Sequence, residues 1–164
     1  MIIGDLKRAA SNLEAILQDR SHDLNEMRWH DAVISYGRNF VTADGRGKKL
    51  EEKHVRDLGT KFLSTHREVM ELRHQYVALA GKNEQQQVFV ALILEQASGH
   101  PKINGVMIQK ATQILPSTED LQQFKELCDK LVQSTNVRLK KATDDLIAHY
   151  QAMTFEQLHK ATKP

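Results

Sequence analysis

The segment TKFLSTHREVMELRHQYVALA, residues 60–80, decides the fold class of this chain. Its apolar residues recur at intervals of three and four, which is the period of one face of an α-helix. Gly81 follows directly, and glycine is common just past the last turn of a helix. The segment therefore predicts a helix that ends near residue 80 and buries one side against other helices.

The same spacing occurs on both sides of this segment. Before it, the pattern predicts helices over about 5–18, 23–41 and 51–58. After it, Ser117 or Thr118 can cap a helix that continues to about residue 153. Such a helix is longer than a compact domain of this size needs, so we expect a partner chain to cover part of it.

Two short apolar runs, rich in Val, Ile, Leu and Phe, lie between the helical segments. QQVFVALILEQ (86–96) and VMIQKATQIL (106–115) flank ASGHPKING, which is rich in turn-forming residues. These runs predict a β-hairpin insert near 87–114, with strands near 87–95 and 104–114, and a short helical pair is the alternative. We therefore expect one mainly α domain over residues 1–164, a bundle of four to five helices with this insert.

Composition restricts the function classes. The net charge of +2 permits nucleic-acid binding without demanding it. The only cysteine, Cys128, excludes an intramolecular disulfide and a cysteine-based zinc site. The eight histidines are scattered, so we expect no metal and no cofactor, although a metal site assembled in three dimensions stays open. The sequence has neither an apolar leader nor a membrane-length apolar run, so we expect a cytoplasmic protein without membrane contact.

Two polar residues interrupt the apolar face of the helix over 60–80. On a helical wheel, Arg73 lies within about 60° of His66 and of several apolar residues. These are Phe62, Val69, Met70, Tyr76 and Val77. Either a carboxylate or carbonyl holds Arg73 and a backbone group holds His66, or this face borders a cleft or dimer seam that binds an anion such as phosphate.

Three segments resemble the HEPN family, helical domains of toxin–antitoxin and antiviral systems. WHDAVISYGRNF (29–40) is similar to the second helix of one bacterial branch, and THREVMELRHQYVALAG (65–81) to its LRxxYVAHAG pattern. AGKNEQQQVFVAL (80–92) resembles the continuation into a strand.

The resemblance implies that two subunits pair and that an arginine holds the scissile phosphate of RNA. It also implies that a later histidine takes part in attack by the 2′-hydroxyl, without a metal. Arg73 matches the arginine and His74 the polar residue, but Leu79 stands at the histidine position. Leucine transfers no proton, so we expect a non-catalytic or impaired homodimer that binds RNA or a protein around Arg73.

Two alternatives remain open. In the first, the chain is an active metal-independent endoribonuclease of toxin or defence type, in which His66 or His74 replaces the missing histidine. In the second, it is a structural helical protein with no nucleic-acid role. Three further cations, Arg46, Lys48 and Lys49, lie in the glycine-rich segment TADGRGKK. They could contact RNA phosphates, although a solvated charge run is the more ordinary explanation.

Overall fold

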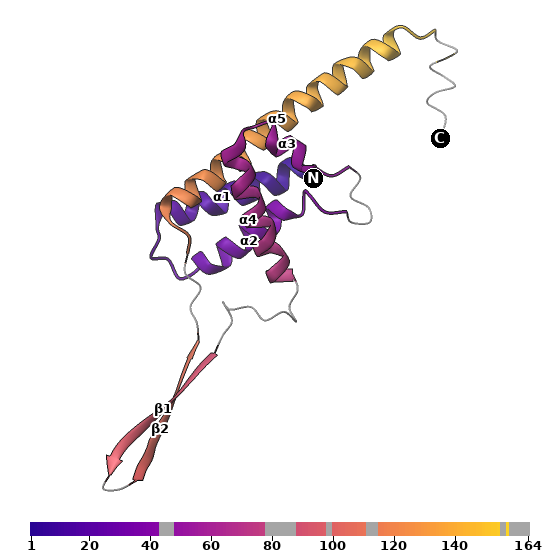
Figure 1. The fold of residues 1–164 in the computed structure, drawn as a ribbon. Helices are drawn as coiled ribbons and strands as arrows, with labels where there is room; N and C mark the ends of the chain where they lie inside the picture. Colours follow the sequence, from indigo (N-terminus) through magenta and orange to yellow (C-terminus); the bar gives the residue numbers. More distant parts are fainter. Residues whose placement is uncertain (43–47, 78–87, 98–99, 111–114, 155–156, 158–164) are drawn as a thin grey trace.

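The computed structural model describes residues 1–42, 48–77, 88–97, 100–110, 115–154 and 157. Its elements follow in the order α1 (Ile2–Gln18), α2 (Asn25–Gly37), α3 (Glu52–Arg56), α4 (Thr60–Val77), β1 (Val88–Ala97), β2 (His100–Lys110) and α5 (Thr118–Gln151). The prediction of a mainly helical, bundle-like fold is confirmed, and Figure 1 shows the helices gathered into one body.

The core lies where α1, α2, α4 and α5 meet. α1 packs against both α2 and α5, and α4 contacts the same two helices from the other side. Aromatic rings fill the centre. The ring centroid of Phe124 in α5 lies 5.9 Å from that of Trp29 and 5.1 Å from that of Tyr36, and both pairs pack edge to face. This packing fixes the position of α2 and α4, the two helices that carry the predicted site residues.

α2 is shorter than the predicted span of 23–41. The side-chain amide of Asn39 donates to the backbone oxygens of Ser35, at 2.9 Å, and Tyr36, at 3.0 Å. These carbonyls are among the last of the helix, where intrahelical partners run out, and the Tyr36 oxygen also accepts the backbone nitrogen of Asn39 at 3.1 Å. The Asn39 amide satisfies them, and the chain turns away after Gly37.

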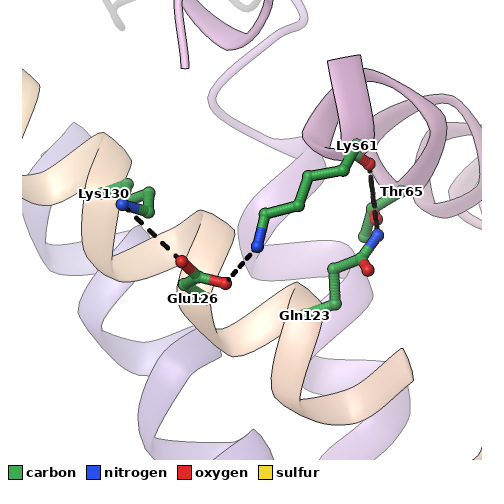
Figure 2. Close-up of polar contacts among 5 residues, drawn as sticks. All are labelled: Lys61, Thr65, Gln123, Glu126 and Lys130. Carbon is green, nitrogen blue, oxygen red and sulfur yellow. Dashed lines mark hydrogen bonds and ion pairs between the residues drawn. The ribbon is translucent and has the colours of Figure 1, made fainter. Parts of the chain in front are cut away.

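Polar contacts attach the start of α4 to α5 (Figure 2). Lys61 Nζ lies 2.8 Å from Glu126 Oε2, and Gln123 Nε2 donates to the Lys61 backbone oxygen at 3.1 Å. Lys130 reaches the other oxygen of Glu126 at 3.6 Å. The ion pair with Lys61 lowers the pKa of Glu126. Because these groups are largely exposed, they orient the helices more than they stabilise them.

β1 and β2 pair antiparallel, from Val88 opposite Lys110 to Ala97 opposite His100, with a register shift after Ile93. Figure 1 shows this pair directed away from the helices. β2 begins at His100, inside the segment expected to be turn. Pro101 fits there, because each strand of a two-stranded sheet is an edge strand that tolerates proline. The predicted strand residues 111–114 lie outside the described part.

α5 begins with the predicted cap, since Ser117 Oγ accepts a hydrogen bond from the backbone nitrogen of Asp120 at 3.1 Å. Figure 1 shows that its C-terminal half leaves the bundle. Among the helices described, none combines the length and apolar character that crossing a membrane requires.

Candidate functional site: a half-buried arginine on α4

Arg73 lies in the last described turn of α4, against the end of α2. Its side chain crosses Gly37 so closely that a Cβ at Gly37 would overlap Arg73 Cδ and lie 3.0 Å from Arg73 Nε. Only glycine leaves room for this contact. Gly37 therefore provides the surface on which the arginine side chain rests.

The guanidinium of Arg73 has no hydrogen-bond or ion-pair partner within the described part of the chain. Its Nε atom is buried and unsatisfied, while the residue as a whole is only half-buried. Among the described residues, no carboxylate or carbonyl of a neighbouring helix holds Arg73, as the first interpretation would require. A partly desolvated cation with open donors is a suitable place for an anion.

His66 lies two turns earlier on α4 and is only 5% exposed. Its Nδ1 lies 2.8 Å from the hydroxyl of Tyr36, and its ring lies 4.5 Å from the ring of Phe40. Burial lowers the pKa of His66, and it raises the pKa of Tyr36 well above the ordinary value for a phenol. A neutral imidazole therefore meets a protonated hydroxyl. The partner of His66 is a side chain, and not the backbone group that the sequence led us to expect.

His66 and His74 both line an open groove of about 420 Å³ between α4 and the segment before α3. Lys49, Arg67 and the carboxylates of Glu51, Glu52 and Glu71 also line it. The structure thus brings His66, His74 and Lys49 together, but Arg73 does not line this groove and packs against Gly37 instead. Lys48 lines a smaller neighbouring pocket with Lys49 and Arg38.

Arg67 is occupied. Its guanidinium lies 3.0 Å from Glu52 Oε1, which also pairs with Arg56 at 3.1 Å. The hydrogen bonds from both arginines lower the pKa of Glu52. Arg67 and His74 also fit the loose spacing of the family motif. Such a catalytic pair would have to break this network, whereas Arg73 has no such competitor among the described residues.

Sequence reasoning missed a small aromatic cluster beside Arg73. Trp29 Nε1 donates to the hydroxyl of Tyr76 at 3.0 Å, and the ring of His30 lies 4.2 Å from that of Tyr76. The only signal in the sequence is that Tyr76 follows Arg73 by three residues, on the same side of the helix. The cluster joins α2 to α4 near the end of α4 that carries Arg73. Val77, which was expected on the buried face, is 53% exposed.

Two predicted site residues, Arg46 and Leu79, lie outside the described residues. In the part of the chain that is described, no three His, Cys, Asp or Glu side chains come together in a way that could hold a metal ion. No protein-family model, curated protein or solved structure matches this chain. The HEPN resemblance therefore stays a prediction from the quoted segments.

Proposed function

We propose that this chain is a HEPN-like helical domain that binds RNA through phosphate contacts at Arg73 and has lost, or nearly lost, ribonuclease activity. The observation that carries the proposal is the unsatisfied guanidinium of Arg73, which rests on Gly37 with Nε buried. A charged group without a partner destabilises the folded chain. A bound phosphate would supply that partner, since its oxygens match the paired donors of arginine.

Other basic residues of the chain are compatible with the same substrate class, although Arg73 does not line the groove beside which they lie. Lys48 and Lys49 are exposed next to the groove that His74 lines, and Arg46 belongs to the same basic segment. The HEPN resemblance would further place a second copy across from Arg73, which would bring two arginines to one seam. In this proposal the partner is RNA, and binding of an acidic protein segment is an outcome that the binding experiment can distinguish.

The loss of catalysis rests on the histidines. Leu79 cannot move a proton, and His66 is engaged by Tyr36 inside the core. Burial also lowers the pKa of His66, so its imidazole is a poor proton acceptor near neutral pH. His74 is exposed, but it lines the groove from which Arg73 is absent.

The binding test compares Arg73→Gln with Arg67→Gln, using fluorescence anisotropy with single-stranded RNA and excess chelator. Both variants remove one positive charge from the same helix, but only Arg73 lacks a carboxylate partner. We expect Arg73→Gln to weaken binding by roughly tenfold or more, as befits a charged hydrogen bond, and Arg67→Gln to have little effect. Equal weakening by both would contradict a specific role for Arg73, and binding of an acidic peptide instead of RNA would reassign the partner.

Gly37→Ala provides a second, independent variant. The added methyl group overlaps the Arg73 side chain, so it should displace the guanidinium while leaving its charge in place. We expect RNA affinity to fall although the net charge is unchanged. If Gly37→Ala binds RNA like the wild type, the packing of the Arg73 side chain on Gly37 does not matter for binding.

The cleavage test compares the wild type, Arg73→Ala and Leu79→His on mixed RNA with excess chelator. We expect the wild type to be inert and Leu79→His to cleave, because the substitution restores the proton-transfer group. Cleavage by the wild type that Arg73→Ala abolishes would show an active nuclease, with His66 or His74 as the next residues to substitute. If none of the three cleaves, any likeness to the family is one of fold alone.

A further inference from the structure

The C-terminal half of α5 has no cover within the described chain. Residues 136–152 are exposed without interruption, and Figure 1 shows this part of the helix extending beyond the bundle. A helix of this length is only marginally stable in water without packing. Its apolar side chains indicate what could stabilise it.

These side chains form a stripe. Val132, Leu139 and Leu146 follow one another along α5 at intervals of seven, which is the spacing of one of the two core positions of a coiled coil. Leu139 is 58% exposed and Leu146 is 53% exposed. On the helical wheel the stripe continues the side that Phe124 and Cys128 bury in the core. The face that packs in the bundle thus runs on into solvent.

Charges on one flank of the stripe are arranged in opposite signs. Arg138 and Asp145 lie seven residues apart, within about 20° of each other on the wheel. Arg138 donates to Ser134 Oγ at 3.0 Å, and in the described part neither residue has an oppositely charged partner. Arg138 and Asp145 each come directly before a leucine of the stripe, which is position g of the heptad. In an antiparallel coiled coil the g positions of the two helices face each other, so Arg138 of each copy would face Asp145 of the other.

A parallel pair would not satisfy these charges. In a parallel coiled coil, a residue on one flank of the stripe faces the residue of the partner helix that lies about five positions later in the sequence, on the other flank. Arg138 would then meet Thr143, and Asp145 would meet Tyr150. The sequence of the helix is therefore complementary to itself only when the second helix runs in the opposite direction.

We propose that a second copy of this chain covers the stripe, with the two α5 helices antiparallel and two Arg138–Asp145 ion pairs at the interface. This surface is separate from Arg73 and does not depend on RNA binding. It also differs from the seam that the HEPN resemblance implies, which would lie at Arg73.

Light scattering after size-exclusion chromatography of the full chain tests the interface. The wild type should have about twice the chain mass of 18.7 kDa. Leu139→Asp with Leu146→Asp should reduce it to a single chain. The matched control is Val137→Asp, because Val137 is 69% exposed and lies about 180° from Leu146 on the wheel. A monomeric wild type, or a dimer that survives the double substitution, would overturn the proposal.

Charge reversal tests the direction of the helices. Arg138→Glu alone and Asp145→Arg alone should each weaken the dimer, since each places like charges at both contacts. A mixture of the two variants should dimerise again, because opposite charges then meet twice. Failure of the mixture to recover, or dissociation of the wild-type dimer by Arg73→Gln, would overturn this interface. Circular dichroism confirms that each variant stays folded.

Discussion

At the scale of single residues, the face of α4 shows two outcomes for a polar group among apolar ones. His66 is buried and meets the hydroxyl of Tyr36 at 2.8 Å. Arg73 rests on Gly37 with no partner among the described residues, and its Nε is buried while the residue as a whole is half-buried. The first arrangement stabilises the core, whereas the second leaves the guanidinium of Arg73 without a partner in the described part of the chain.

His66 should make stability depend on pH. Burial lowers its pKa below the ordinary 6.5, so the unfolded chain takes up a proton at a higher pH than the folded chain does. The contribution of neutral His66 to the free energy of unfolding is complete above pH 6.5. It is lost as the pH falls from there through the lower pKa of the folded state. Urea unfolding should therefore show a smaller loss of stability between about pH 7 and about pH 5 for His66→Gln than for the wild type.

His54→Gln serves as the control for this measurement. The pKa of His54 is also lowered, first by burial and then by the charge of Arg138, so its own share of the pH dependence must be measured separately. If His66→Gln loses as much stability as the wild type over this range, His66 is not buried as the neutral form.

Tyr36→Phe should leave the His66 ring nitrogen without its partner. An unsatisfied buried group costs about 1–3 kcal/mol, so the free energy of unfolding should fall by about that amount, as measured in urea. The same substitution in a His66→Phe background should cost nothing, because the hydroxyl then has no partner to lose. An equal cost in both backgrounds would show that the pair does not interact.

At the scale of elements, side-chain hydrogen bonds decide where two helices stop or start. The Asn39 amide donates to two of the last carbonyls of α2, and Ser117 Oγ accepts from the backbone nitrogen of Asp120 in the first turn of α5. Sequence patterns left Ser117 and Thr118 as alternatives for the cap, and the structure selects Ser117. Thr118 is the first residue of the helix, where its hydroxyl lies near Arg20 at 3.4 Å.

This choice predicts different costs for two neighbouring substitutions. Ser117→Ala should lower the free energy of unfolding by about 1 kcal/mol, the usual cost of losing such a cap. Thr118→Ala should change it much less, and Ser117→Asp should retain most of the stability because aspartate also caps. Chemical denaturation of the three variants provides the measurement, and a larger cost at Thr118 than at Ser117 would contradict the assignment.

At the scale of the whole molecule, the mild net charge of +2 argues for few phosphate contacts. If Arg46, Lys48, Lys49 and Arg73 each neutralise one phosphate, the logarithm of the RNA affinity should fall with the logarithm of salt at a slope of roughly −3 per chain. Arg73→Gln should make this slope shallower by about 0.7. Titrations at several salt concentrations measure it, and an affinity independent of salt would exclude phosphate contacts.

The amino-acid sequence by itself determined the helical class, the approximate spans of the helices and the position of the apolar face on α4. The reason is that helical periodicity is a local property, readable from spacing alone. It also placed Arg73 and His66 on that face correctly. Among the described elements, the end of α2 and the start of β2 differed most from the prediction, because side-chain hydrogen bonds and strand pairing decided them.

The tertiary structure alone decided which polar group is satisfied. Arg73 and His66 look alike on a helical wheel, and their difference arises from α2, where Tyr36 supplies a hydroxyl and Gly37 leaves space. The structure likewise separated the apolar residues of α5 into a buried part and an exposed part. Both outcomes depend on which elements pack together, and contacts between residues distant in sequence cannot be read from local spacing.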